Sequence, residues 1–208
     1  MSLNSNAVIT LENLKVYLHI SEDAYNSLLE KLINAVSEDL ETRFGWSLIY
    51  TSYSSSKLDG DGRKDFYLPG RPVWAVSALT EGDDTLVEDT DYVIKETGSH
   101  RSYLRKILSG ETYDNDLVWA KGINNIVISY TAGWWVEGDP AAADGATEMP
   151  EDIQMGVAMQ VGLLKKRFDA EDWDVSSQAF PDGSISKNII ELHPFYKEII
   201  NKYRRVLL

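Results

Sequence analysis

One short segment of the sequence has the residue types of a cation-binding loop. Asp59–Gly60–Asp61–Gly62–Arg63 alternates carboxylates with glycines, as calcium-binding loops do. An EF-hand loop that began at Asp59 would need an oxygen ligand at Arg63 and a bidentate glutamate at Gly70, and neither residue can supply one. We therefore interpret the segment as a β-turn between two strands.

The other common sources of catalytic or metal chemistry are absent from the sequence. His19, His100 and His193 are far apart, and none belongs to a His-Glu-x-x-His pair. The chain has no cysteine, which excludes disulfides, thiolate zinc sites and cysteine nucleophiles. It also lacks the Gly-x-Ser-x-Gly elbow and the glycine-rich phosphate-binding motifs. We expect no catalytic residue, no bound metal and no other cofactor.

Four carboxylates surround Trp173 and could in principle supply an acid–base pair. They are Asp169, Glu171, Asp172 and Asp174. General acid–base catalysis needs one buried carboxyl group with a raised pKa. Because all four lie within six residues of a predicted loop, we expect them to be solvated and not catalytic.

The adjacent pair Trp134–Trp135 has two interpretations. Neighbouring residues of a strand point to opposite faces, so at most one of the two rings can pack into a given core. The simpler interpretation is one core residue and one partly covered residue. The functional interpretation is an aromatic anchor at a subunit contact, since tryptophan and tyrosine dominate interface hot spots. A platform for stacking a sugar is a smaller alternative.

Two helices are predicted at the beginning of the chain. Thr10 is a candidate N-cap of the first helix, and Ser21 is a candidate N-cap of the second, with acidic residues in its first turn. Gly45 is well placed to end the second helix in a left-handed cap. The apolar stripe of the second helix is Tyr25, Leu28, Leu29, Leu32, Ile33, Val36 and Leu40.

The middle of the chain changes from helical to strand periodicity. The predicted strands are Leu48–Ser54, Phe66–Leu68, Val73–Leu79, Tyr92–Lys95, Tyr103–Ile107 and Ile126–Tyr130. Tight turn signals, such as Glu81–Gly82–Asp83–Asp84, separate them and favour antiparallel pairing. The polar, Gly/Ala-rich segment 137–149 is predicted to be a mobile loop.

Helix is predicted again from Pro150, followed by a loop over Asp169–Lys187 and a last helix from about Pro194 to Val206. Gly156 and Gly162 weaken the first of these helices by about 1 kcal/mol each in isolation, which indicates close packing against a neighbour. The predicted fold class is α+β, with the terminal helices packed as a small bundle and a β-rich antiparallel insertion in the middle. We expect a single domain over residues 7–208, helical at 10–45 and 150–206, β-rich at 46–135, with the mobile loop at 136–149.

Composition narrows the class of protein further. The chain has 208 residues, and its 33 acidic against 20 basic side chains give a formal charge of −13. An acid excess of this size disfavours a protein that grips nucleic acid through phosphate neutralisation. Neither a secretory signal nor an apolar run long enough to cross a membrane is present, so we expect a soluble intracellular protein.

The order of motifs along the chain resembles a known family. An Ile9–Thr10–Leu11–Glu12–Asn13–Leu14–Lys15 opening precedes the long helix, which ends in Leu40–Glu41–Thr42–Arg43–Phe44–Gly45–Trp46. The later motifs, in order, are Leu68–Pro69–Gly70–Arg71–Pro72–Val73, Asp91–Tyr92, Ile126–Val127–Ile128–Ser129–Tyr130–Thr131–Ala132–Gly133–Trp134, Met149–Pro150–Glu151–Asp152–Ile153 and Tyr203–Arg204–Arg205. No single motif is specific. In combination they resemble the head–tail connector, or adaptor, family of tailed bacteriophages, also described as DNA-packaging proteins.

The resemblance implies a structural role without a reaction. It implies a homo-oligomeric, dodecameric ring in the virion neck, below the portal protein and above a tail-completion or stopper protein, in a phage or prophage assembled in the bacterial cytoplasm. Phage DNA would pass through this ring only as cargo, and no membrane is involved. Candidate subunit or portal contacts are Trp134, Trp135, Lys202, Tyr203, Arg204 and Arg205. Lys197 belongs to the same basic C-terminal segment, which we expect to dock onto the portal.

Two other functions stay open from the sequence alone. A carbohydrate- or ligand-binding module could use exposed aromatic residues of the β-rich part. A small hydrolase could use scattered carboxylates, although no catalytic spacing of them is present.

Overall fold

A computed structural model describes residues 2–108, 117–136, 145–169, 177–180, 183–186 and 192–204. The chain divides into two compact units. The helical unit comprises Met1–Phe44 and Pro150–Leu208, and the β unit comprises Gly45–Met149. Most of the predicted mobile loop, residues 137–144, lies outside the described residues.

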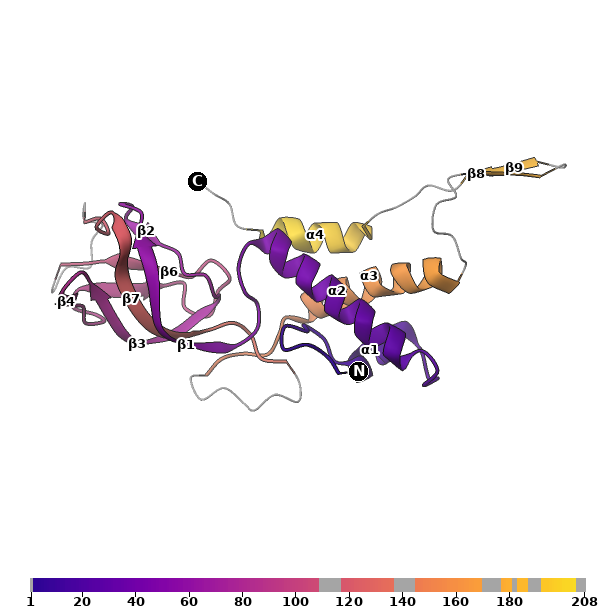
Figure 1. The fold of residues 1–208 in the computed structure, drawn as a ribbon, viewed down its shortest axis with the longest axis horizontal. Coiled ribbons are helices and arrows are strands. Elements are labelled where there is room, and N and C mark those ends of the chain that lie inside the picture. Colours follow the sequence, from indigo (N-terminus) through magenta and orange to yellow (C-terminus); the bar gives the residue numbers. More distant parts are fainter. Residues whose placement is uncertain are drawn as a thin grey trace. The chain divides into compact units, whose positions relative to one another are not determined.

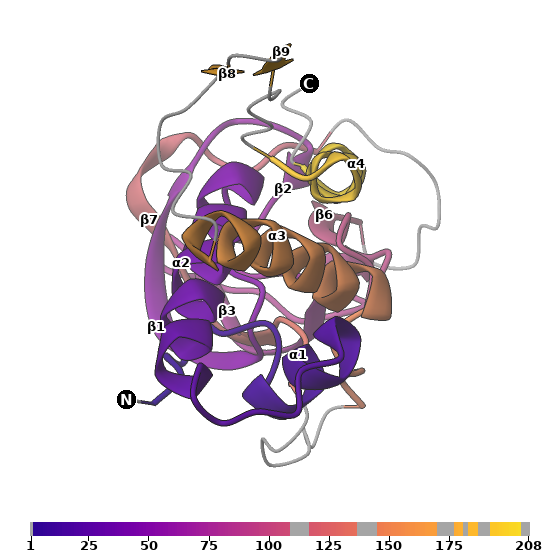
Figure 2. The same ribbon diagram turned by 90° about the vertical axis from the view of Figure 1, so that its right-hand side faces the viewer.

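In the described residues, four helices build the helical unit: α1 (Leu11–Leu18), α2 (Asn26–Phe44), α3 (Glu151–Asp169) and α4 (Pro194–Tyr203). Helix α3 packs against each of the other three, and Figure 2 shows it between α1 and α4. The buried side chains come from both halves of the unit, and most of those of α2 belong to its predicted apolar stripe. They include Leu14, Leu29, Ile33, Val36, Leu40, Ile153, Val157, Val161, Tyr196 and Ile199. The prediction of terminal helices packed together is confirmed.

The structure confirms two of the predicted helix ends and corrects a third. The Thr10 hydroxyl accepts a hydrogen bond from the Asn13 N–H (3.2 Å), and Gly45 has a φ of +74° after α2. The prediction that Ser21 caps the second helix is wrong, because α2 begins at Asn26. The reason lies in Asp23, whose carboxylate accepts hydrogen bonds from Lys15 and from the Asn26 side chain and is therefore held in the turn before the helix.

The two glycines of α3 mark its closest contacts. A Cβ added at Gly156 would lie 3.0 Å from Ile199 Cγ1 of α4, and one added at Gly162 would lie 2.9 Å from Leu18 Cδ2 of α1. The predicted close packing is therefore confirmed, and both neighbours belong to the same unit.

A two-stranded hairpin stands where the sequence predicted only a loop. Strands β8 (Ser177–Phe180) and β9 (Gly183–Ser186) pair with each other in an antiparallel register. The prediction of loop over Asp169–Lys187 is wrong at these residues. Four-residue strands without apolar alternation give little periodic signal, although Pro181–Asp182–Gly183 between them is a typical turn sequence.

Seven strands build the described part of the β unit. Figure 1 draws the strands as arrows. They are β1 (Thr51–Gly60), β2 (Asp65–Phe66), β3 (Val73–Glu81), β4 (Asp84–Thr85), β5 (Tyr92–Lys95), β6 (Tyr103–Lys106) and β7 (Gly122–Ala132). The antiparallel pairs form one sheet in the order β1-β7-β3-β4 and a second in the order β2-β6-β5. The α+β fold class with a β-rich antiparallel middle is confirmed; the short strand β4 was not predicted.

The core of the β unit lies between its two sheets. Trp119 is fully buried there, with its ring centroid 5.4 Å from that of Phe66. An ion pair between Lys106 of β6 and Glu81 of β3 joins the sheets, and Glu81 Oε1 also accepts a hydrogen bond from the Ala120 N–H (2.6 Å). The buried apolar residues of this core are Phe66, Leu68, Val73, Leu79, Tyr92, Leu104, Trp119, Ile126, Ile128, Tyr130 and Ala132.

None of the helices in the described ranges combines the length and the apolar character that crossing a membrane requires.

Candidate assembly surfaces

The aspartates considered first for cation binding have hydrogen-bond partners within the β unit. Asp59 Oδ1 accepts a hydrogen bond from the Asn124 N–H (2.7 Å), and Asp61 Oδ1 accepts one from the Arg63 N–H (3.0 Å). Asp59 and Gly60 belong to β1, so only Asp61–Arg63 of the segment lies in the connection between β1 and β2. Within the part of the chain that the structure describes, no group of three or more His, Cys, Asp or Glu side chains is arranged to hold a metal ion.

Of the predicted acidic cluster, only Asp169 belongs to the described residues. Asp169 forms an ion pair with Lys165 at 2.6 Å, one helical turn earlier on α3. Glu171, Asp172, Trp173 and Asp174 lie outside the described residues.

The two adjacent tryptophans contact different neighbours. Trp134 is 4% exposed, and its ring centroid lies 5.7 Å from that of Trp46. Trp135 is half-buried, and its indole N–H donates a hydrogen bond to the Ala146 carbonyl (3.2 Å). Of the pair, Trp135 therefore has the surface that another chain could cover.

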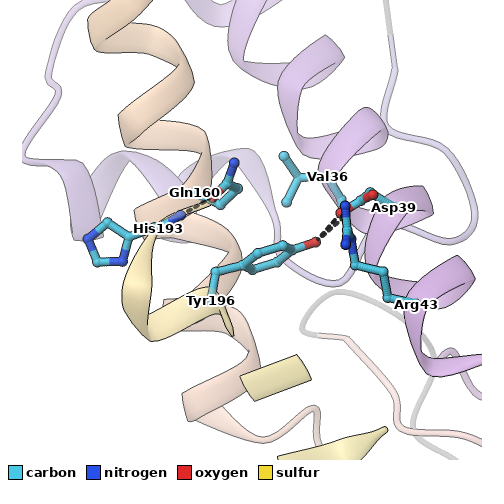
Figure 3. A network of polar contacts seen from close by, with 6 residues as sticks. All are labelled: Val36, Asp39, Arg43, Gln160, His193 and Tyr196. Atoms are coloured by element: carbon cyan, nitrogen blue, oxygen red, sulfur yellow. Dashed lines mark hydrogen bonds and ion pairs between the residues drawn. The ribbon is translucent and has the colours of Figure 1, made fainter. Parts of the chain in front are cut away.

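Helix α4 is fixed to α2 by a buried tyrosine (Figure 3). The Tyr196 hydroxyl lies 3.2 Å from the Val36 carbonyl and 3.0 Å from Asp39 Oδ2, and Asp39 in turn accepts a hydrogen bond from Arg43 Nε (2.7 Å). Burial is the main reason that the pKa of Tyr196 is raised, and the nearby Asp39 carboxylate raises it further. The phenol therefore stays protonated and keeps its hydrogen bond.

The first turn of α4 is fixed to α3. The His193 N–H donates to Gln160 Oε1 at 2.7 Å, which Figure 3 shows as a dashed line. His193 Nδ1 accepts a hydrogen bond from the Phe195 N–H (3.3 Å), so the histidine serves as the N-cap of α4. His193 therefore has a structural role in the helix cap.

The end of α4 combines an internal anchor with an exposed basic surface. Asp152 of α3 accepts hydrogen bonds from Lys202 Nζ (2.7 Å) and from the Tyr203 hydroxyl (3.1 Å). The hydrogen bond to Asp152 raises the pKa of Lys202, and burial raises that of Tyr203. Tyr203 is buried, whereas Lys202 and Arg204 are exposed. The predicted contact residue Arg205 lies outside the described residues.

An open groove of about 730 Å³ runs along α1 and the segment that follows it. Its lining residues are Leu11, Glu12, Lys15, Val16, His19, Ile20 and Ser21. Val16 is 68% exposed and contributes an apolar side chain to this groove. The sequence did not predict this groove. Its one indication in the sequence is Val16, an apolar residue outside the buried face of an amphipathic helix.

Comparisons with known proteins identify a family and similar structures. The family described as "HCP: Head completion protein" matches the chain over residues 7–206. A chain of the structure titled "Virion of native gene transfer agent (GTA) particle" is similar to this one, with a TM-score of 0.51, 14% sequence identity, and coverage of 100% of this chain and 94% of that chain. A chain of "Neck of empty GTA particle computed with C6 symmetry" is similar with a TM-score of 0.51, 15% identity and the same coverage. No curated protein matches the chain significantly.

Proposed function

Because the chain belongs to the head completion protein family, we propose that it is a non-enzymatic structural protein of a virion neck, where copies of it form a ring below the portal. The observation that carries this proposal is the family match over residues 7–206, which includes both units of the fold. The similar neck structure, which was computed with C6 symmetry, supports a symmetric assembly of repeated copies.

The charge of the chain fits a ring that surrounds DNA without holding it. The formal charge of −13 would repel the phosphates of passing DNA wherever acidic side chains face the channel. Proteins that bind DNA tightly instead place lysine and arginine against the backbone. We propose that phage DNA passes through the ring as cargo during packaging and ejection, with a tail-completion or stopper protein docked below.

The portal contact is assigned to the basic end of α4. Arg204 and Lys202 are exposed there, and Arg205 follows directly in the sequence. Tyr203 contributes by anchoring this end to Asp152 and to Phe44, whose ring centroid lies 5.9 Å from its own. In the β unit, Trp135 is the corresponding candidate for a contact between copies; Trp134 is nearly covered by its own chain.

A binding experiment with purified portal rings tests the proposal. Light scattering should show the chain joining portal rings, and electron microscopy should show a second ring beneath the portal. A double substitution, Arg204→Glu with Arg205→Glu, should weaken portal binding at least about tenfold, because each change reverses a charge at the contact.

The matched control is Lys31→Glu, which reverses a charge at an exposed position of α2. This variant should bind portal rings as the unchanged chain does. Equal binding by all three proteins would contradict the assignment to α4, and no association with portal rings under any condition would contradict the proposed function itself.

No observation favours the sugar-binding alternative. Such a module needs exposed aromatic faces, but Trp46, Trp119 and Trp134 are each at most 5% exposed. The indole N–H of Trp74 donates to the Gly133 carbonyl at 2.6 Å and is occupied within the fold.

A further inference from the structure

Helix α1 has an exposed stripe of side chains in addition to the face that it buries. The buried residue of α1 is Leu14. On the other side of the helix, Glu12, Val16 and His19 recur at the spacing of one helix face, and all three are exposed. Val16 is 68% exposed and lies in the open groove along α1. A stripe that is apolar at its centre and polar at both ends is suited to packing against another helix.

Helix α3 also has a partly exposed stripe. Its members, which recur at the spacing of one helix face, are Met155, Met159, Leu163 and Lys166. Met159 is 37% exposed and Lys166 is exposed, whereas Met155 and Leu163 are half-buried. Methionine side chains are flexible and adapt to the shape of a partner, so this stripe is suited to a contact surface.

The charges of the two stripes are complementary. The α1 stripe carries Glu12 and the α3 stripe carries Lys166, and neither forms an ion pair within the described parts of the chain. Lys15 borders the α1 stripe, but its charge is neutralised by Asp23, whose Oδ1 lies 2.7 Å from Lys15 Nζ. An uncompensated anion on α1 therefore faces solvent, and so does an uncompensated cation on α3.

The two stripes also match in length when the helices run antiparallel. With a rise of about 1.5 Å per residue, Val16 lies about 6 Å along α1 from Glu12. On α3, Leu163 and Met159 lie about 4.5 Å and about 10.5 Å from Lys166. An α1 helix that pairs Glu12 with Lys166 therefore brings Val16 to the space between Leu163 and Met159. Helices pack in this way, with the side chains of one between those of the other.

We propose that the exposed stripe of α1 in one copy packs against the stripe of α3 in the next copy. This inference rests on the proposed ring, since it assigns one of the contacts between neighbouring copies. Two different surfaces of the helical unit meet, so the contact is heterologous and can repeat around a closed ring. It involves none of the residues assigned to the portal contact.

Charge reversal tests this contact on purified portal rings. Glu12→Lys alone places two cations opposite each other, and Lys166→Glu alone places two anions. Either single variant should raise the concentration at which copies complete a ring on the portal, measured by light scattering, at least about fivefold, because like charges meet. The matched controls are Glu38→Lys and Lys31→Glu at exposed positions of α2, and both should assemble as the unchanged chain does.

Combining the two reversals should restore assembly. A chain with both Glu12→Lys and Lys166→Glu again joins opposite charges at every contact. An equimolar mixture of the two single variants should also recover, because copies that alternate around an even-numbered ring join opposite charges at every contact. A simple loss of folding in either single variant would not be repaired in this mixture.

Cysteine cross-linking tests the same contact without a change of charge, because the chain has no cysteine of its own. Two single variants of the full chain, Val16→Cys and Met159→Cys, are mixed with portal rings and oxidised, so a disulfide between them can join only different copies. The mixed dimer is expected at a yield at least about tenfold above that of a control mixture, because packed side chains bring Cβ atoms within disulfide range. The control pairs Val16→Cys with Ala35→Cys, an exposed position of α2.

Several outcomes would overturn the inference. Mixed disulfides no more abundant than in the control would exclude the contact. Dimers of Val16→Cys alone that outnumber the mixed dimers would do the same, since α1 would then pack against α1. A doubly reversed chain that assembles no better than the single variants would also contradict it. Complete rings on the portal without mixed disulfides would contradict this contact and leave the proposed function standing. Mixed disulfides without any association with the portal would support the contact and contradict the proposed function.

Discussion

At the residue scale, a few polar side chains fix how the helices meet. The Tyr196 hydroxyl reaches the Val36 carbonyl across 160 positions of sequence, and it does so inside the helical core. A buried hydroxyl without a partner is costly, so this contact favours one placement of α4 over others. Asp152 also favours this placement of α4, because at the other end of the helix its carboxylate accepts hydrogen bonds from Lys202 and Tyr203.

Replacing Tyr196 with phenylalanine should lower the free energy of unfolding by about 1–2 kcal/mol, because a buried hydrogen bond to a carboxylate is lost. Chemical denaturation followed by circular dichroism measures the change. Tyr17→Phe is the matched control: its hydroxyl contacts Glu151 at 3.3 Å on the exposed surface, so the same substitution should cost less than about 0.5 kcal/mol. An equal decrease in the free energy of unfolding of the two variants would show that the buried hydrogen bond of Tyr196 stabilises the fold no more than the exposed one of Tyr17.

Tyr92 should make the β unit sensitive to alkaline pH. Burial, followed by the nearby Glu88 and Asp89 carboxylates, raises the pKa of Tyr92 to about 12. Between the unfolded pKa of about 10 and this value, the unfolded state releases a proton that the folded state keeps, so stability is fully present below pH 10 and falls as pH rises.

The loss due to Tyr92 should reach at most about 1.4 kcal/mol per pH unit. Urea unfolding at pH 9, 10 and 11, compared between the unchanged chain and Tyr92→Phe, isolates this contribution. The variant should lose stability less steeply above pH 10. Parallel slopes for the two proteins would mean that Tyr92 is not held protonated by the fold.

At the scale of elements, the predictable features were those with a strong side-chain period. The stripe Tyr25–Leu40 predicted α2 because an amphipathic helix of this length needs an apolar face to pack. The β8–β9 hairpin was missed because backbone pairing, not apolar alternation, defines it. Ser21 has the right residue type for a cap, but side-chain contacts of Asp23 delay the helix to Asn26. Such tertiary competition leaves no mark in a local sequence window.

For the candidate surfaces too, residue types could be predicted from the sequence, whereas contacts between distant residues could not. A basic C-terminal segment could be identified from residue types alone, and so could a divided role for Trp134 and Trp135. That Asp152 would hold Lys202 depended on a contact 50 positions apart, which no spacing indicates. The groove at Val16 likewise exists only because the turn after α1 folds beside the helix.

The two glycines of α3 should respond differently to alanine. At Gly156 the new methyl group would meet Ile199 Cγ1 and Cβ, and a β-branched side chain cannot easily move aside. We expect Gly156→Ala to destabilise the helical unit by about 1–2 kcal/mol.

At Gly162 the new methyl group would meet only the end of the Leu18 side chain, which can change its rotamer. The gain in helix propensity of about 1 kcal/mol should then offset the contact, and Gly162→Ala should stay within about 0.5 kcal/mol of the unchanged chain. Thermal and urea unfolding of both variants measures the difference. A larger loss at Gly162 than at Gly156 would contradict this order.

At the scale of the whole molecule, the β unit is inserted in the sequence between the two segments of the helical unit. The β unit is a single continuous segment, Gly45–Met149, whereas the helical unit is assembled from two segments. Only the β unit can therefore be cut out without breaking its own chain. Its core is contributed by both of its sheets and by Trp119, all from within this segment.

The isolated fragment Gly45–Met149 should accordingly fold on its own. We expect a cooperative unfolding transition, a strand-rich circular dichroism spectrum and dispersed amide signals in NMR. A Trp119→Ala version of the fragment is the control, and it should lose about 3–5 kcal/mol or fail to fold, because Trp119 is fully buried. A fragment that stays unfolded with Trp119 intact would show that the β unit depends on the helices.

The split of the helical unit also sets an order of events on the ribosome. Helices α1 and α2 are synthesised before the β unit, with their apolar stripes uncovered, and α3 and α4 are synthesised after it. Tyr196 and Tyr203, which close the core against Val36 and Phe44, both lie in α4. The nascent chain therefore cannot complete its helical core until α4 has been translated and released from the ribosome. A chain interrupted before α4 would lack Tyr196 and Tyr203, and the apolar stripes of α1 and α2 would stay partly uncovered.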